Sequence, residues 1–245
     1  MKMQFGGLSA MDLAALVYFM IAWLAYAPFV RWREKRMLGV GTAMVNHRRD
    51  WMDALLGRDM KVADTAIVGH IMSTASFFAS TTVIVIAALL GVLINIGKNA
   101  PGVVEPWWLA IPMPDALQIK IGLILVVAYY AFQSFTWAIR QANFAAVLMG
   151  AAPQSASLDI ELRQRLAVSM VSIITGVATS YDNGMRAYYF ALGGITWIIS
   201  PILFILVTTG VVALLLYRHA HSLTAVALRE IAAAKSEALR RNSDH

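Results

Sequence analysis

Residues 80–96 read STTVIVIAALLGVLINI, and this stretch decides the class of fold. It carries no charge, and the predicted span that contains it begins near Ile71. A helix needs about 20 apolar residues to cross the roughly 30 Å hydrocarbon core of a bilayer. Comparable apolar runs occupy Leu13–Val30, Ile119–Ala131 and Ile195–Tyr217. The sequence therefore predicts an all-α, polytopic transmembrane helix bundle.

The composition agrees with this class. Hydrophobic residues make up 59% of the 245 residues and charged residues only 14%, against about 25% charged residues in a soluble domain. Nothing separates a soluble half from a membrane half, so we expect one membrane-embedded domain over residues 1–245. The chain has no cysteine, which excludes a disulfide framework and a thiolate nucleophile.

We expect five spans, near residues 12–30, 71–96, 116–138, 165–182 and 188–217. The third helix has no breaker before Gly150 and Pro153, so it should run on to Met149, beyond the bilayer. The fourth span is the weakest, because Ser and Thr interrupt its apolar residues. The connection 31–69 is basic, and its residues 50–56 have the spacing of an amphipathic helix. The basic tail 218–245 should carry a cytoplasmic helix near residues 223–239.

The basic residues predict the orientation. With five spans, all but four of the 20 Lys and Arg fall on one side, the exceptions being Lys2, Lys98, Lys120 and Arg186. The positive-inside rule then places the N-terminus outside and the C-terminus in the cytoplasm of a bacterial inner membrane. The first apolar run precedes its basic residues, so we expect a retained span and not a cleaved signal peptide. The net charge of +6 indicates contact with the bilayer and its anionic headgroups and not with nucleic acid.

Polar residues inside spans are the candidates for a site, because each is costly in a membrane unless it is paired or hydrated. The second span has a face rich in hydroxyls, and the third has polar residues near its inner end. A polar pathway or ion contact would use Ser73, Ser76, Ser80, Thr81, Gln133, Arg140 and Asn143. Alternatively, the hydroxyls bond to carbonyls of their own helix, and Arg140 extends to the interface.

Asp182 and Arg186 are four residues apart and would share one face of a continuous helix. They could form an ion or anion site at the outer end of the bundle. However, Asn183 and Gly184 between them are a turn signal, so the alternative is a hydrogen-bonded corner between the fourth and fifth spans.

The sequence offers no arrangement for catalysis. It holds no nucleophile–base motif, no Gly-rich phosphate loop and no zinc-protease motif. His219 and His221 have the wrong spacing to share a helical face, and no acidic cluster joins them or His70. We therefore expect no enzyme activity, no cofactor and no metal.

Two segments resemble a known family. One is FTWAIRQANF at residues 135–144, which leads to GAAP at residues 150–153, and the other is NGMRAYYFAL at residues 183–192, followed by Trp197 and Pro201. Together with ASTT at residues 79–82, they resemble domain-of-unknown-function family 599, a family of multi-pass membrane proteins. The resemblance implies a membrane bundle without an assigned activity, and it supplies no site residues.

Two functions remain open from the sequence. The hydroxyl-rich second span, with small residues every four positions, favours a homo-oligomeric pore or a transporter of a small solute or ion. The absence of recognisable chemistry favours a non-catalytic accessory or scaffolding subunit that binds a membrane-protein partner. A membrane enzyme acting on lipid would have Arg140 and little else.

Overall fold

The computed structural model describes residues 7–36, 40–96, 114–153 and 159–221, with a few isolated positions in the tail. The described part is an all-helical bundle. Its elements are α1 (Ala10–Arg36), α2 (Val40–Leu56), α3 (Val62–Ile96), α4 (Pro114–Ala151), α5 (Ile160–Ile199) and α6 (Pro201–His221). The residues on which a tail helix at 223–239 depends lie mostly outside this description.

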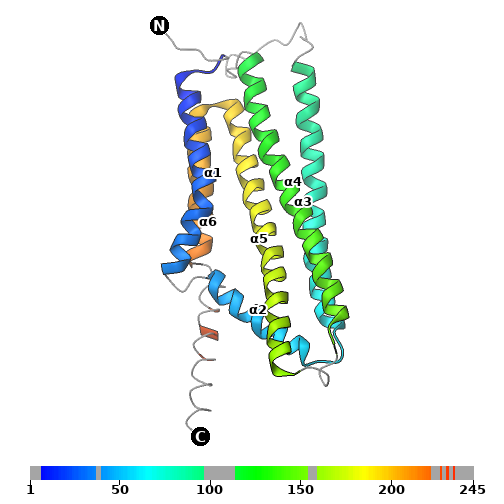
Figure 1. Ribbon diagram of the computed structural model, residues 1–245. Helices are drawn as coiled ribbons and strands as arrows, with labels where there is room; N and C mark the ends of the chain where they lie inside the picture. Colours follow the sequence, from blue (N-terminus) through cyan, green and yellow to red (C-terminus); the bar gives the residue numbers. More distant parts are fainter. Residues whose placement is uncertain are drawn as a thin grey trace.

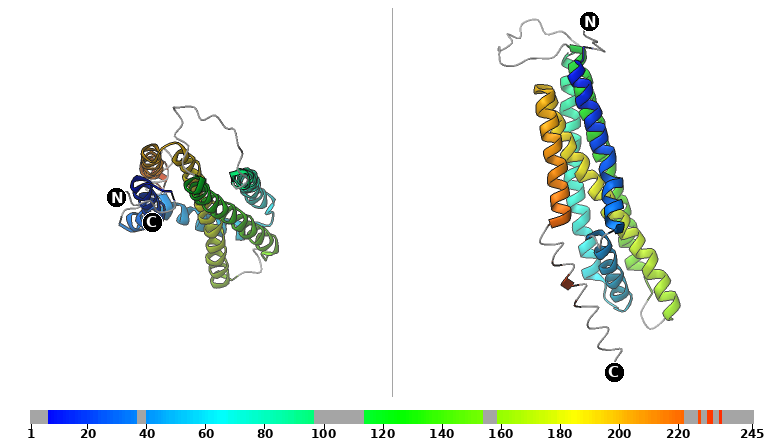
Figure 2. Two further views of the ribbon diagram at one scale, coloured as in Figure 1. Left: turned by 90° about the horizontal axis from the view of Figure 1, so that it is seen from above. Right: turned by 90° about the vertical axis from the view of Figure 1, so that its left-hand side faces the viewer.

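The long helices run up and down in turn, and α2 lies at one end of the bundle (Figure 1). α4 lies between α3 and α5, and α1 packs beside α6, as the two other views also show (Figure 2). α3, α4 and α5 contain 35, 38 and 40 residues, against 27 in α1 and 21 in α6. At about 1.5 Å per residue, the three long helices exceed the roughly 30 Å of a bilayer core by about 20–30 Å. The three long helices extend past the lower ends of α1 and α6, toward the end where α2 lies (Figure 1).

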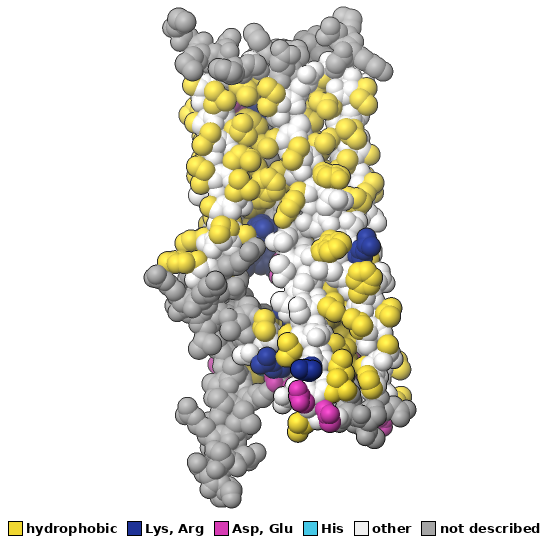
Figure 3. All heavy atoms as spheres, viewed as in Figure 1, with side chains coloured by type: hydrophobic (Ala, Val, Ile, Leu, Met, Phe, Trp, Pro, Cys, Tyr) yellow, Lys and Arg dark blue, Asp and Glu magenta, His cyan; other side chains and the backbone are white. Residues whose placement is uncertain are grey.

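Four helices are long and apolar enough to cross a membrane. They are Ala10–Val30, Val62–Ile96, Ala116–Ala151 and Pro201–Arg218. α5 is not among these four, although it is the longest of the described helices. Hydrophobic side chains cover most of the upper part of the surface, and charged side chains gather toward the α2 end (Figure 3). The chain is a membrane protein.

The fourth span was predicted to end at residue 182, and this boundary is wrong. No turn occurs at Asn183-Gly184, and α5 continues through both residues to Ile199. The break falls instead at Ser200, whose backbone is extended (φ −159°, ψ 137°) just before Pro201. The ring of a proline disfavours helical backbone in the residue before it, and proline itself is well placed in a first helical turn. Pro201, expected inside the last span, therefore begins α6.

Gly184 has a packing role in place of a turn role. It is buried, and a Cβ atom added to it would lie 2.7 Å from Cε1 of Phe135 on α4. Only a residue without a side chain lets the Phe135 ring lie against the α5 backbone here. The Phe135 ring in turn stacks on Phe78 of α3, with ring centroids 5.5 Å apart. This contact joins the three long helices at mid-height.

The bundle has two apolar cores. The first is aromatic and lies where α1 and α6 pack against α4 and α5, with Phe19, Phe190, Trp197 and Phe204 almost fully buried. The second lies at the opposite end, where Met52, Leu55 and Leu56 of α2 pack against α3, α4 and α5. The amphipathic helix expected near residues 50–56 is thus present as the C-terminal half of α2, and its apolar face is buried against the bundle.

A buried ion pair joins three helices near the N-terminal end of α1. Lys120 Nζ lies 2.9 Å from Asp12 Oδ1, and the Trp197 indole N–H donates to the same oxygen over 2.9 Å. Asp12 is 8% exposed and Lys120 4%. Ser9 donates to the second oxygen through its backbone N–H and its hydroxyl. Each charge is therefore compensated, which a buried pair requires.

Candidate functional site

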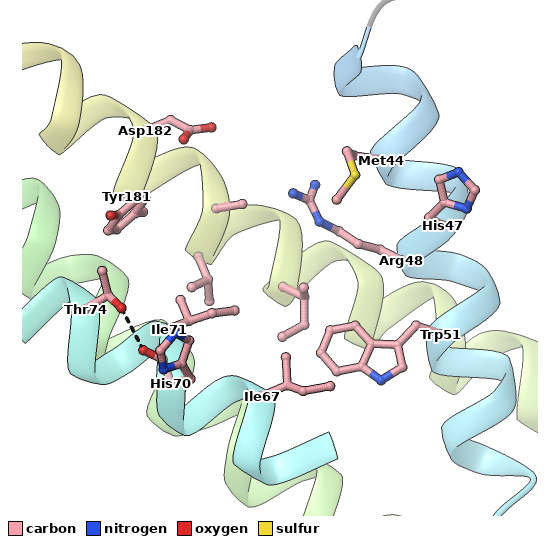
Figure 4. A pocket seen from close by; sticks show the side chains of 13 residues that line it. Met44, His47, Arg48, Trp51, Ile67, His70, Ile71, Thr74, Tyr181 and Asp182 are labelled. Atoms are coloured by element: carbon pink, nitrogen blue, oxygen red, sulfur yellow. Dashed lines mark hydrogen bonds between the residues drawn. The ribbon is translucent and has the colours of Figure 1, made fainter. Parts of the chain in front are cut away.

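A half-open cavity of about 540 Å³ lies between α2, α3 and α5 (Figure 4). This volume falls within the usual range of small-molecule sites. Its walls are mainly apolar and aromatic, with Met44 and Trp51 from α2, Ile67 and Ile71 from α3, and Ile174 and Val177 from α5. Ala178 of α5 also belongs to the apolar lining. The charged or polar residues of the lining are His47, Arg48, His70, Thr74, Tyr181 and Asp182.

Two hydrogen bonds hold α2 in place as one wall of this cavity. The Trp51 indole N–H donates to Oδ1 of Asp64 on α3 over 2.7 Å, and Asp64 is 1% exposed. On the other side, the Arg163 guanidinium of α5 donates to the backbone carbonyl of Asp53 over 2.6 Å. Both bonds involve a charged group, the stronger kind of hydrogen bond. The orientation of Trp51 and its neighbours is therefore fixed from α3 and from α5.

Opposite charges stand on facing walls. Arg48 extends from α2 into the space between α2 and α5, on the side where Asp182 of α5 lies (Figure 4). Burial lowers the pKa of the Arg48 guanidinium, and the nearby Asp182 carboxylate acts in the opposite direction. A guanidinium stays protonated under any physiological condition, so Arg48 is a permanent cation in an apolar wall.

Two histidines belong to the lining. His47 Nδ1 lies 4.0 Å from a carboxylate oxygen of Asp50, while its Nε2 is buried without a hydrogen-bond partner in the described part of the chain. The backbone carbonyl of His70 accepts the hydroxyl of Thr74 over 3.0 Å, as the dashed line in Figure 4 shows. Within the described ranges, no three His, Asp or Glu side chains converge on a point that could hold a metal ion.

The hydroxyls proposed for a polar pathway do not face the interior of the bundle. Ser73, Ser76 and Ser80 are exposed on the outer face of α3, whereas Ala75 and Ala79 of the same helix are buried. The Thr81 hydroxyl donates to the carbonyl of Phe77 in its own helix over 2.9 Å.

The three candidate residues of α4 are also exposed. Gln133, Arg140 and Asn143 lie on the outer surface, and the Arg140 guanidinium is 5.9 Å from the ring centroids of both Trp137 and Phe144. Arg140 therefore sits between two half-exposed aromatic rings. This arrangement is typical of a membrane interface, where such rings and extended cations gather.

The structure gives Asp182 and Arg186 different surroundings. Asp182 lines the cavity, whereas Arg186 donates to the side-chain oxygen of Asn183 over 3.0 Å and lies 5.6 Å from the ring centroid of Tyr26 on α1. Neither marks a corner, since α5 is continuous here. Of the nine proposed site residues, Asp182 alone lines the cavity between α2, α3 and α5.

Sequence reasoning missed the residues that face Asp182. Arg48 and Trp51 lie in a basic connection that the sequence indicates only as amphipathic, and charged residues in such segments usually face solvent. The available signal was the pattern itself: Met44, Arg48 and Trp51 recur at spacings of three or four and lie on one face of α2. Asp12 and Lys120 form the buried ion pair described above, and no local pattern in the sequence indicates this pairing.

Comparison with known proteins gives a family. The family described as "Protein of unknown function, DUF599" matches residues 14–224, which is most of the chain. The chain belongs to this family, as the motifs at residues 135–144 and 183–192 indicated. No curated protein and no solved structure matches.

Proposed function

We propose that this protein is a non-catalytic membrane protein that binds a small amphipathic molecule in the cavity between α2, α3 and α5. The observation that carries the proposal is the cavity itself: a space of ligand size, with apolar walls and a few convergent polar groups.

The alternative of a pore through one bundle has less support. A conducting path needs polar side chains along the interior, but large buried aromatic rings fill the space between the helices, among them Phe135, Phe190, Trp197 and Phe204. Ser73, Ser76 and Ser80 of α3 lie on its exposed face. A binding site at one end of the bundle, serving a carrier or a receptor, fits these positions better.

We further propose that the α2 end faces the cytoplasm of a bacterial cell. The described basic residues Arg48, Arg49, Arg58, Lys61, Arg163 and Arg165 belong to the segments around this end. An excess of Lys and Arg marks cytoplasmic segments of membrane proteins. The cavity then opens near the inner leaflet.

A bulky substitution tests the binding function. Ala178 lines the cavity on α5, whereas Ser172 of the same helix is exposed and lies outside it. We expect wild-type protein, extracted in mild detergent, to retain a small molecule visible by native mass spectrometry. Ala178→Trp should lose that molecule, and Ser172→Trp should keep it. Retention by both variants, or an empty wild-type protein, would refute the proposal.

A second candidate is a pore around the axis of a homo-oligomer. Its support is a row of small residues exposed on α3 at spacings of three, four or seven: Gly69, Ser73, Ser76, Ser80, Ala87 and Gly91. Small residues allow close helix–helix contact in membranes. A native mass at an integer multiple of 26.8 kDa, with solute flux in liposomes, would support the pore. A mass that requires other chains would support the accessory subunit.

A further inference from the structure

The outer face of α4 carries one exposed cation among apolar and aromatic side chains. Over residues 116–151, α4 has two basic residues, Lys120 and Arg140. Lys120 is buried in its pair with Asp12, whereas Arg140 is exposed. In the described part of the chain, no carboxylate pairs with the Arg140 guanidinium, and no acceptor forms a hydrogen bond with it. The N–H donors of this guanidinium are therefore available to a molecule outside the protein.

Two aromatic rings hold this guanidinium in place. Trp137 precedes Arg140 by three residues and Phe144 follows it by four, so both share its face of the helix. The guanidinium carbon lies 5.9 Å from each ring centroid, within the range of a cation–π contact. The two residues are 50% and 52% exposed, so the rings flank the guanidinium without covering it. Arg140 thus has a preferred position and still presents its N–H groups outward.

The level of Arg140 is where the hydrocarbon core of the bilayer ends. α6 needs its whole apolar stretch Pro201–Arg218 to cross a bilayer, since 18 residues give about 27 Å of helix. One boundary of the core is therefore near Pro201, just after the end of α5 at Ile199. On α5, Ser180 lies 19 residues before Ile199, which is about 28 Å. The Ser180 hydroxyl donates to the side-chain oxygen of Gln141 over 3.1 Å, and Gln141 adjoins Arg140. Arg140 is therefore at the second boundary, in the leaflet on the α2 side.

The surroundings of Arg140 favour a partner that is purely anionic. A cation at the edge of the hydrocarbon core is costly unless an anion compensates it. The phosphate groups of lipids lie at this depth. Residues 65–96 of α3 and 116–151 of α4 contain no Asp or Glu, so these helices offer no carboxylate to the ammonium of a zwitterionic head group. Asn143, three residues after Arg140, is also exposed, and its amide can hydrogen-bond to a hydroxyl of a head group.

We propose that the exposed face of α4 binds an anionic phospholipid of the phosphatidylglycerol type at Trp137, Arg140 and Asn143. The lipid phosphate lies at Arg140, a head-group hydroxyl lies at Asn143, and the start of an acyl chain lies along Trp137. A guanidinium matches two phosphate oxygens through its paired N–H groups. None of these three residues lines the cavity between α2, α3 and α5, so this lipid site is independent of the binding function proposed above.

The test uses the full-length protein in vesicles containing equal amounts of phosphatidylglycerol and phosphatidylethanolamine. After extraction in mild detergent, native mass spectrometry reports how much of each lipid stays bound. Wild type should retain phosphatidylglycerol in preference to phosphatidylethanolamine. Arg140→Gln should lower the retention of phosphatidylglycerol about tenfold, because a charge-assisted contact is lost. Arg140→Lys keeps the charge but lacks the paired N–H groups, and it should retain an intermediate amount.

Matched controls keep the readout specific to the α4 face. Arg165→Gln makes the same change of charge at another exposed arginine, which pairs with Glu161 at 3.6 Å on α5. This variant should retain phosphatidylglycerol as wild type does. Ala178→Trp fills the cavity and should also leave the retention of this lipid unchanged. Thermal melts show whether each variant is folded, and the exposed position of Arg140 predicts a wild-type Tm for Arg140→Gln.

Four results would overturn the lipid site. Equal retention of the two lipids by wild type would show that α4 does not select a head group, and an unchanged preference in Arg140→Gln would exclude Arg140 as the contact. Loss of phosphatidylglycerol in Ala178→Trp would place the lipid in the cavity. Displacement of the lipid by millimolar inorganic phosphate would indicate a site for a free anion. Failure of the cavity to hold a molecule would leave the lipid site on α4 unaffected.

Discussion

Substitution of Gly184 by alanine tests the packing that makes α5 one continuous helix. The added Cβ would lie 2.7, 2.8 and 2.9 Å from three atoms of the Phe135 ring. Ordinary contacts begin near 3.4 Å, so the ring must move by several tenths of an ångström. It has little room, because Phe135 is 0% exposed and its ring contacts those of Phe78 and Tyr181 at centroid distances of 5.5 and 5.8 Å.

The magnitude follows from this geometry. Overpacking a tight site costs about 1–3 kcal/mol, because neighbours are forced from their rotamers or helices shift apart. Alanine returns at most about 1 kcal/mol through its better helix propensity. We therefore expect Gly184→Ala to lower the free energy of unfolding by up to about 2 kcal/mol. For a chain of this size, that corresponds to a fall in Tm of about 4–8 °C at the upper limit.

Thermal unfolding in one detergent, followed by circular dichroism, measures the effect. Gly122→Ala on α4 is the matched control, since an added Cβ there meets nothing within 4 Å and stability should be unchanged or slightly higher. Adding Phe135→Leu to Gly184→Ala should cost less than the sum of the two single changes. Equal stability of the Gly184→Ala and Gly122→Ala proteins would refute the close contact between α4 and α5.

Two further substitutions test the polar contacts. Lys120→Met leaves the buried Asp12 carboxylate without its cation and should destabilise the protein by about 3–5 kcal/mol in the same melt. Adding Asp12→Leu to Lys120→Met should recover much of this loss of stability. No recovery in the double variant would contradict the ion pair. Trp51→Phe removes the N–H donor to Asp64 and should cost about 1–3 kcal/mol. Faster proteolysis near α2 would show that this wall of the cavity has loosened, and an unchanged cleavage pattern would argue against the bond.

The apolar runs predicted the helices well where hydrophobicity alone decides them. α1 and α4 occupy nearly the expected residues, and α4 continues to the Gly150–Pro153 region as the absence of a breaker indicated. α3 begins nine residues before the expected Ile71. Its first turns carry Asp64 and His70, which a membrane argument assigns to a loop. These turns are helical because Val68, Ile71 and Met72 pack into the apolar core shared with α2 and α4.

The continuity of α5 through Asn183 and Gly184 could not be predicted from local signals. Asn-Gly is a turn signal in isolation, but here Gly184 serves the close approach of Phe135, a contact between residues 49 positions apart in the sequence. Similarly, Asp182 was a candidate because a carboxylate is costly in a membrane. The sequence does not show that Arg48, from a separate helix, lines the same cavity. Periodicity shows which residues share one face, and it does not show which helix that face meets.

The claim that the cavity holds a small amphipathic molecule can be tested directly in the native membrane. A photoreactive amino acid at Thr74 would face the cavity, and the same residue at Ser80 would face outward from α3. After irradiation, mass spectrometry of the adducts identifies the molecule beside each position. We predict one defined small-molecule adduct at Thr74, which is absent from the lipid mixture captured at Ser80. No adduct at Thr74, or the same mixture at both positions, would contradict the account.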